Sequence, residues 1–204
     1  MTQGVSKVLS TEPLLESEAV WTALVKTTYK DPTGTTRTWE YAERRTRPLG
    51  SEIDGVGIVA ILERESGPEI VLQKQYRPPI DRVVIEMPAG LVDEGETAEE
   101  AAIRELKEET GYVGHILETS PVIWNDPGFC NTNLKMVHVG VDMRLPANQD
   151  PKPELEENEF IEVFHVRLAD LWETCIKMDN LGYAIDARIA NIAEGIEIAK
   201  KFKL

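Results

Sequence analysis

The amino-acid sequence predicts an α/β protein in which a mixed β-sheet is sandwiched between helices (α/β/α), behind an N-terminal antiparallel β-hairpin layer. A length of 204 residues, with 42% apolar and 28% charged residues, suits one domain of ordinary size with its own core. Strand-like segments bounded by turn signals outnumber helical ones, which favours a sheet with few helices on its faces. We therefore assign residues 1–50 to the hairpin layer and residues 51–204 to the main domain.

The hairpin layer is predicted from two strand-like runs on either side of the turn-like residues Asp-Pro-Thr-Gly at 31–34. In the main domain, two apolar runs joined by another turn-like segment begin the sheet, and proline and glycine end the strand that follows them. A loop rich in proline and acidic residues is expected at 145–159. Strands are predicted at 20–29, 35–47, 55–62, 69–77, 82–90, 115–124, 134–143 and 160–168, and helices at 97–111, 168–178 and 186–204.

The helix at 97–111 has the clearest boundaries. Good helix formers occupy it throughout, and Thr97 with Glu100 forms the pattern of a capping box at its start. Gly111 supplies a C-terminal stop, because glycine readily adopts the left-handed conformation that ends helices.

Composition and charge exclude several classes of function. Sequence-independent binding to nucleic acid requires an excess of cationic side chains, whereas this chain has a net charge of −14. We therefore expect no nucleic-acid partner. Cys130 and Cys175 make neither a disulfide framework nor a zinc site. No apolar run approaches membrane-spanning length, and the first twenty residues lack the apolar region of a signal peptide. We expect no membrane partner, and a cytoplasmic or nuclear location.

Three glutamates of the predicted helix share one face. Glu105 and Glu109 are four residues apart, and Glu108 lies three residues after Glu105. Like charges at this spacing repel one another unless a cation offsets them. A solvated helix face and a divalent-cation site both explain the cluster on spacing alone. If it is a cation site, hard oxygen ligands favour magnesium or manganese.

A wider pattern favours the cation site. Gly90, then Glu96 six residues later, then the run Arg-Glu-Leu-Lys-Glu-Glu-Thr-Gly-Tyr at 104–112 resembles the Nudix box, with Tyr112 in place of the usual aliphatic residue. Nine positions at fixed spacing make the match specific. The chain is therefore similar to the Nudix hydrolases, which cleave a diphosphate linked to another group, and the resemblance implies the Nudix fold.

The resemblance also implies roles for residues of the box. Glu105 and Glu109 would bind the metal, with Glu108 close behind and the backbone carbonyl of Ala89 as a further ligand. The metal would be Mg²⁺, with Mn²⁺ as a substitute. Arg104 would act in catalysis by orienting a box carboxylate.

Attack of water on phosphorus needs a base as well as metal ions. The family resemblance, in which a glutamate of a loop after the box often serves catalysis, favours Glu162, which follows the acidic loop. An outward-facing carboxylate on an edge strand is the alternative interpretation of Glu162. The choice of base among Glu162, Glu108 and a metal-bound hydroxide stays open.

Segments outside the box resemble the ADP-ribose pyrophosphatase branch of the family, close to the ADP-sugar diphosphatases. The matching pieces include Lys-Gln-Tyr-Arg-Pro-Pro at 74–79, Asp-Pro-Gly at 126–128 and Asp-Ala-Arg at 186–188. In this branch Trp21 and Trp39 would sandwich the adenine, because stacking suits a flat heterocycle. The other implied substrate contacts are Arg44 and Arg77 for the phosphates, Glu86 for the ribose or base edge, Leu91, and Asp126 for the terminal ribose.

The branch further implies a homodimer in which one tryptophan of each site comes from the partner subunit. A homodimer is also expected because a two-stranded layer by itself has only marginal stability. The expected activity is hydrolysis of ADP-ribose to AMP and ribose 5-phosphate. Two alternatives remain: a hydrolase for another nucleoside diphosphate sugar or an oxidised nucleotide, and a catalytically silent domain that binds ADP-ribose.

Overall fold

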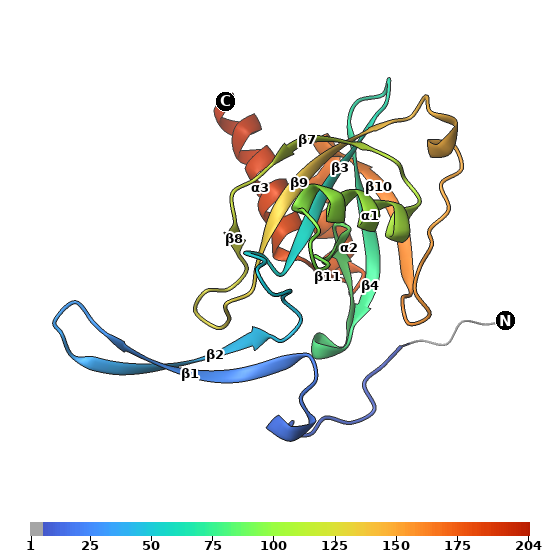
Figure 1. Cartoon of the computed structure of the whole chain (residues 1–204). Helices are drawn as coiled ribbons and strands as arrows, with labels where there is room; N and C mark the ends of the chain where they lie inside the picture. Colours follow the sequence, from blue (N-terminus) through green and yellow to red (C-terminus); the bar gives the residue numbers. More distant parts are fainter. Residues whose placement is uncertain (1–5) are drawn as a thin grey trace.

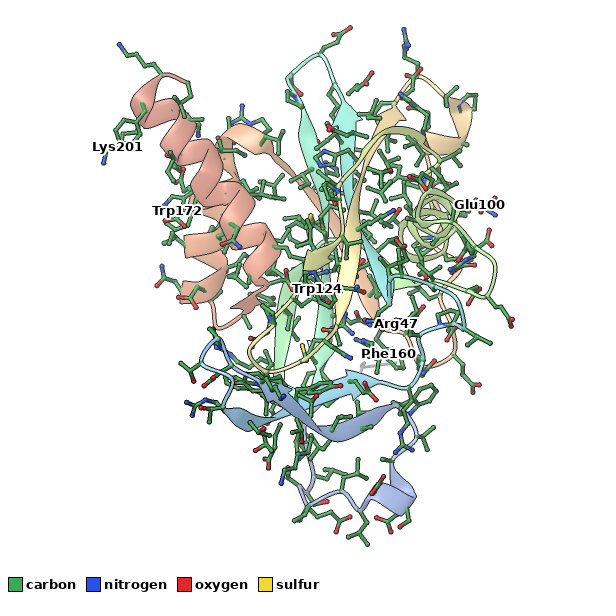
Figure 2. The ribbon with its side chains drawn as sticks, turned by 60° about the vertical axis from the view of Figure 1, so that its left-hand side comes forward. Arg47, Glu100, Trp124, Phe160, Trp172 and Lys201 are labelled. Atoms are coloured by element: carbon green, nitrogen blue, oxygen red, sulfur yellow. The ribbon has the colours of Figure 1, made fainter. Side chains whose placement is uncertain are left out.

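The expected layers are present in the computed structural model, which describes residues 6–204. Helix α1 (Ala98–Thr110) covers one face of a large mixed sheet, while α2 (Leu171–Asn180) and α3 (Ala187–Phe202) cover the other (Figure 1). Figure 2 shows the same layers from the side, with α2 and α3 separated from α1 by the strands. The α/β/α prediction is confirmed. The first five residues of the range predicted as hairpin layer lie outside the described residues.

The sheet mixes parallel and antiparallel pairs. Over residues 6–204 its strands follow the order β11-β5-β4-β3-β9-β7, with β10 beside β4, β6 beside β3 and β8 beside β9. Strands β3 and β9 pair in parallel, as do β5 and β11, and the other pairs are antiparallel. The strands are β3 (Gly55–Glu63), β4 (Glu69–Arg77), β5 (Arg82–Glu86), β6 (Ala89–Leu91), β7 (His115–Thr119), β8 (Ile123–Trp124), β9 (Asn133–Asp142), β10 (Ile161–Arg167) and β11 (Ala184–Ile185).

Two strands that the sequence predicts as single are broken, and one strand was not predicted. The predicted strand 82–90 divides into β5 and β6, and the predicted strand 115–124 divides into β7 and β8. Pro88 and Pro121 lie in the two gaps, where proline has no N–H to donate to a ladder. Strand β11 has only two residues, too few for an alternation pattern to reveal.

Strand β3 changes its neighbour partway along its length, and this opens the place where α1 approaches the sheet. At one end β3 pairs with β4 through Ile61 and Leu62. At the other end it pairs with β6, where Gly55 lies opposite Leu91. A Cβ atom on Gly55 would overlap the carbonyl of Gly90, so only glycine allows the two backbones this close. The connection from β5 to β6 therefore enters the sheet between β3 and β4.

Two apolar clusters fill the space on the two faces of the sheet. Leu106 of α1 packs against alternate residues of β3, including Ile58, while Ile189 of α3 packs against the residues between them, including Val59. Because both faces are covered, β3 reads as a continuous apolar run. No helix within residues 6–204 is long and apolar enough to cross a membrane.

The predicted ends of the box helix are confirmed. Thr97 Oγ1 accepts a hydrogen bond from the Glu100 amide, and the Glu100 carboxylate accepts one from the Thr97 amide, which completes the capping box. Gly111 follows the helix in the left-handed conformation, with φ of 75°.

The N-terminal hairpin forms an arm that projects from the domain (Figure 1). Strands β1 (Thr22–Lys30) and β2 (Thr36–Arg44) pair only with each other among the described strands. Arg47 anchors the end of the arm, because its guanidinium lies 2.7 Å from the Asp54 carboxylate and also donates to the carbonyl of Asn131. The loop before β9 runs beside β2, where the Ala42 amide donates to a loop carbonyl over 2.9 Å.

The acidic loop after β9 is tied to the domain by Asn148, which is fully buried. Its side-chain amide donates to the carbonyls of Val113 and Asp142, and its oxygen accepts a hydrogen bond from the Val113 amide, all over 2.9 Å. Three backbone groups of two separate segments therefore depend on one side chain.

We expect Asn148→Ala to lower the free energy of unfolding by about 2–3 kcal/mol, because it leaves buried backbone groups without partners. Urea denaturation followed by circular dichroism measures the change. Asp150→Ala, at an exposed position two residues further along, is the matched control. Equal stability of the two variants would contradict the role assigned to Asn148.

Candidate active site

Glu109 lies between α1 and the sheet and is 3% exposed. Its carboxylate accepts hydrogen bonds from the Ala89 amide over 2.9 Å and from the Gln73 side chain over 3.4 Å. Burial raises the pKa of the Glu109 carboxyl to about 8, against the lowering effect of these two donors. A carboxyl buried in this way favours a cation beside it.

Glu105 lies one helical turn before Glu109, against the backbone of β6. A Cβ atom on Gly90 would overlap the Glu105 carboxylate, so a larger residue here would displace that carboxylate from its position. Burial raises the pKa of the Glu105 carboxyl, and the Arg104 guanidinium opposes that rise. The two box carboxylates and the strand backbone thus meet at the opening between β3 and β4.

Arg104 joins the carboxylates at the exposed side of the box. Its guanidinium lies 2.8 Å from Glu96, 2.8 Å from Glu105 and 3.1 Å from Glu108, and it donates to the carbonyl of Leu91. The hydrogen bonds that Arg104 donates to Glu96 and Glu105 raise the pKa of its guanidinium, so it stays charged. These contacts place one guanidinium among three carboxylates of the box.

The donor set fits a hard divalent cation. Glu105 and Glu109 offer carboxylate oxygens near the β6 backbone, and two carboxylates that both lose solvent contact are stabilised by positive charge between them. In residues 6–204 no three His, Cys, Asp or Glu side chains already form a ligand-like group. Protein donors hold the box glutamates instead: Arg104 binds Glu105 and Glu108, and the Ala89 amide binds Glu109.

Glu162, the residue that the sequence suggests as a base, lies away from the box carboxylates. It pairs in register with Lys74, and its carboxylate lies 2.6 Å from the Lys74 ammonium. The Lys74 ammonium lies 5.4 Å from the ring centre of Tyr183, which packs with α2 and α3. Side chains of residues directly opposite each other on paired strands point to the same face of the sheet, so Glu162 also lies on the α2 and α3 side. The Glu162 side chain is 69% exposed there. The neighbouring pair, Gln73 with Val163, faces α1.

Glu159, which sequence reasoning left unassigned, is another carboxylate of the acidic loop. Its charge opposes ionisation of both Glu105 and Glu109, contributing to the raised pKa of each. It lies just before β10, at the end of the same acidic loop that suggested Glu162. The loop position was a usable signal, but it could not distinguish two glutamates three residues apart.

Glu86 and Arg77 lie on the α1 side of the sheet. Glu86 pairs in register with Gln73, so it shares a face with the side chain that touches Glu109. Its buried carboxylate lies 2.9 Å from the half-exposed Arg77 guanidinium. Burial raises the pKa of Glu86, and Arg77 opposes the rise. The structure therefore brings Arg77, Glu86 and Leu91 to the region of the box.

The predicted adenine contacts lie on the arm. The Trp39 indole N–H donates to the Gly128 carbonyl over 3.1 Å, which ties this ring to the loop that carries Asp126. Trp39 lies opposite Thr27 in the hairpin, whereas Trp21 lies beside Arg45, six register positions away. At about 3.3 Å per residue, the two tryptophans of one chain are roughly 20 Å apart along the strands. They do not sandwich one base within a single chain.

Arg44 and Asp126 also lie on the exposed side of this region. Arg44 ends β2 opposite Thr22, at the junction of the arm with the domain. Asp126 begins the loop beside the arm, and its backbone carbonyl accepts hydrogen bonds from the amides of Phe129 and Cys130. Neither residue has a contact with the box carboxylates.

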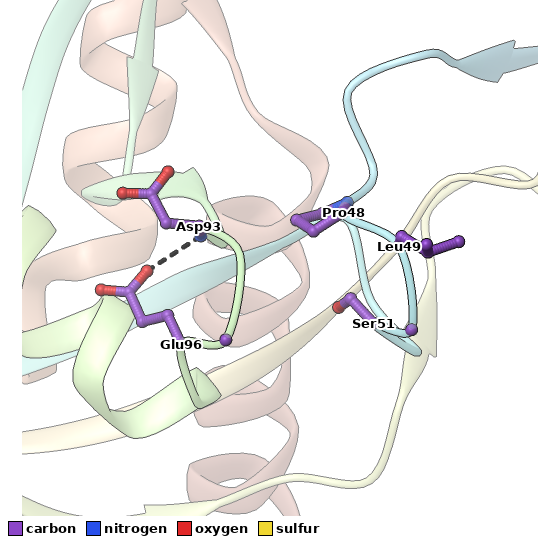
Figure 3. Close-up of a pocket in the computed structure, with 7 residues that line it drawn as sticks. Pro48, Leu49, Ser51, Asp93 and Glu96 are labelled. Atoms are coloured by element: carbon purple, nitrogen blue, oxygen red, sulfur yellow. Dashed lines mark hydrogen bonds between the residues drawn. The ribbon is translucent and has the colours of Figure 1, made fainter.

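A shallow pocket opens beside the box, between the Pro48–Ser51 loop and the Asp93–Glu96 loop (Figure 3). A Glu96 carboxylate oxygen accepts the Asp93 amide there over 3.0 Å. The lining includes two carboxylates and no basic side chain, so it repels the phosphates of a nucleotide. The pocket does not include Glu105 or Glu109.

The chain is similar to known proteins over most of its length. The family model described as the NUDIX domain matches residues 53–185. An ADP-ribose pyrophosphatase from Saccharomyces cerevisiae is 53% identical over 190 residues, which cover 92% of this chain and 82% of the relative. An ADP-sugar pyrophosphatase from Mus musculus is 40% identical over 188 residues, which cover 90% and 84%. An ADP-ribose pyrophosphatase from Bacillus subtilis is 40% identical over 114 residues, which cover 56% and 60%.

The family match spans the core cluster on the α1 side, the box helix and the strand that carries Gln73, whereas Ile189 and Ala193 of the other cluster lie beyond it. It includes every residue of the carboxylate cluster around Arg104. The arm precedes the matched residues. The chain belongs to the Nudix family of hydrolases.

Proposed function

We propose that this protein hydrolyses the diphosphate bond of ADP-ribose to give AMP and ribose 5-phosphate. The observation that carries the proposal is the pair of carboxylates, buried Glu109 and partly buried Glu105, against the backbone of Ala89 and Gly90. Two relatives that resemble the chain over more than four-fifths of their length are named for cleavage of ADP-ribose or an ADP-sugar. Related ADP-sugars are the expected secondary substrates.

We propose that Mg²⁺, or Mn²⁺ in its place, is held by Glu105 and Glu109, with Glu108 and the Ala89 carbonyl beside them. When bound, the metal offsets charge on the phosphoryl oxygens and makes water a better nucleophile. Arg104 holds Glu105 and Glu108 in place, because its guanidinium contacts both carboxylates.

The base that accepts the proton of the attacking water is best sought in the acidic loop. Glu159 is our choice, since its charge acts on both buried box carboxylates. Glu162 would have to leave Lys74 and move to the other face of its strand. Glu108, held by Arg104 and partly exposed, remains a second choice.

Recognition of the substrate is proposed for the residues around the box and on the arm. Arg77 would bind phosphate, as a guanidinium fork matches two oxygens, and buried Glu86 keeps that fork oriented. Leu91 would line the part of the substrate site next to the box, and Arg44 and Asp126 would line the part next to the arm. Trp21 and Trp39 would stack on the adenine from two different chains.

We propose a homodimer with two composite sites. The arm exposes large apolar side chains, with Leu24 88% exposed and Trp21 69% exposed. A two-stranded hairpin outside the main sheet is stabilised when a second chain covers its exposed apolar side chains. The separation of Trp21 and Trp39 supports the same conclusion, because a second chain can bring the missing ring.

The activity is tested with a substrate panel in the presence of magnesium. We expect the specificity constant for ADP-ribose to exceed those for GDP-mannose and a dinucleoside polyphosphate by about tenfold or more, since the site must hold an adenine and two phosphates. Removal of metal with a chelator should abolish turnover, and magnesium should restore it. A panel led by GDP-mannose would contradict the substrate assignment.

Glu109→Gln tests the role of the buried carboxylate. We expect kcat to fall by about a thousandfold, because the variant keeps the shape of the side chain and loses a metal ligand. Unchanged turnover would remove Glu109 from the metal site. Glu100→Gln, on the exposed side of the same helix (Figure 2), is the matched control.

The same variant has a stability signature in metal-free protein. Because burial raises the folded-state pKa of Glu109 from 4.5 to about 8, folding favours its protonated form. The stability of the wild type should therefore fall as the pH rises from about 4.5 to 8, and this loss should be absent in Glu109→Gln. Thermal unfolding of both proteins across that range measures the difference.

The composite site is tested by mixing two inactive proteins. If each site takes Trp21 from one chain and Trp39 from the other, Trp21→Ala and Trp39→Ala should each bind ADP-ribose poorly, and their mixture should regain activity. Random exchange of subunits leaves about one quarter of sites with both rings, given two-fold symmetry. A mixture no more active than its components, or a fully active monomer in sedimentation, would contradict the proposal.

A further inference from the structure

The acidic loop lies across the C-terminal end of the box helix, and we call its residues 149–159 the strap. The Glu154 amide of the strap donates a hydrogen bond of 2.7 Å to the carbonyl of Glu108, in the last turn of α1. The Lys107 ammonium lies 3.0 Å from the Glu154 carboxylate. The strap thus supplies a partner to a carbonyl that the helix itself leaves unpaired.

Gly111 makes room for the strap as well as ending the helix. A Cβ atom at this position would overlap the backbone of Pro151 and Lys152. By contrast Gly95, which also has a positive φ of 80°, has no atom within 4 Å of such a Cβ. Close packing on the strap is therefore specific to Gly111, whereas a positive φ is shared by both glycines.

The strap ends in a turn that holds Glu159. The Glu159 amide donates to the Glu156 carbonyl over 3.1 Å, and the Glu159 carboxylate accepts the Glu156 amide over 3.0 Å. Glu159 lies five positions after Glu154, which is bound to the box helix. Asn148 fixes the other end of the strap.

We propose that the Glu154 amide and Gly111 are positioning elements for the reaction, and that they act by holding the strap, with the turn that carries Glu159, against the end of the box helix. The inference rests on the proposed function, in which Glu159 is the base. It adds a direct link from the box helix to the base, which does not pass through the sheet. Glu108 then has two parts in the site: its side chain faces Arg104, and its carbonyl holds the strap.

The backbone hydrogen bond carries this link, and the ion pair contributes little. Lys107 and Glu154 have side chains that are more than half exposed, and such surface pairs contribute on the order of 0.2–1 kcal/mol. Lys107→Ala should therefore leave kcat unchanged. A change of the backbone is needed to move the strap.

Glu154→Pro removes the donor and places a ring against the Glu108 carbonyl. We expect kcat for ADP-ribose to fall by about a hundredfold, as for the loss of a positioned base, with KM unchanged. Glu157→Pro is the matched control, because residue 157 is the second residue of the 156–159 turn, a position that favours proline. Glu157→Pro should keep the wild-type kcat. Wild-type kcat in Glu154→Pro would overturn the proposal.

Gly111→Asn provides a second variant that does not depend on the strap amide. Asparagine tolerates the left-handed conformation, so the helix can still end there, but its Cβ meets the strap. Gly95→Asn is its control, with a similar φ and open space. We expect only Gly111→Asn to lose kcat. Equal kcat values for the two asparagine variants would overturn the role of Gly111.

A double-mutant comparison distinguishes positioning from general damage to the fold. If the strap acts only through Glu159, Glu154→Pro should have no further effect on kcat in a Glu159→Gln background. An equal loss in both backgrounds, or full activity of Glu159→Gln alone, would overturn the proposal while leaving ADP-ribose hydrolysis established.

Hydrogen exchange of the strap is a readout that does not require activity. Peptides covering residues 146–160 should exchange faster in Glu154→Pro and Gly111→Asn than in their controls, with unchanged exchange in the sheet. Equal exchange would overturn the proposal. A wild-type protein that leaves ADP-ribose intact would instead overturn the proposed function, and the exchange experiment would still decide whether the strap is bound to the box helix.

Discussion

Glu109 is an ionisable carboxyl buried between a helix and a sheet, and the rest of the site is arranged around that constraint. Its position depends on the Ala89 amide, which is available because β6 replaces β4 beside β3. That replacement requires glycine at 55, and the approach of Glu105 requires glycine at 90. Burial of two acidic groups together is unfavourable unless positive charge joins them. The same geometry that makes the apo site unfavourable makes it suited to a cation.

Chemistry and recognition belong to different parts of the molecule. The carboxylates lie on a helix and strands that share a well-packed core, which keeps their positions fixed. The tryptophans lie on an arm outside that sheet, joined to the domain by Arg47 and by the loop beside β2. In the proposed dimer, a second chain would complete the substrate-binding surface at the exposed arm without disturbing the packed core that holds the carboxylates.

Several features of the fold and site were predictable because they depend on neighbouring residues. Thr97, Glu100 and Gly111 define the ends of the box helix, and their hydrogen bonds and φ angle are as expected. The prediction of one strand at 82–90 is wrong around Pro88, where the chain leaves β4 as its neighbour and pairs with β3 instead. For Glu162, alternation along the strand shows that it faces away from Val163. That alternation does not reveal which face of the sheet packs against the box helix.

The sequence by itself determined the fold class, the box and the types of ligand it offers, because periodicity, caps and fixed spacing act over a few residues. Tertiary structure decided which carboxylates meet. It placed Glu162 on the face opposite the box helix, because strand register sets the direction of every side chain in the ladder. It also separated Trp21 from Trp39 and laid the strap on Gly111. These are contacts between segments distant in the chain, and local patterns carry no information about them.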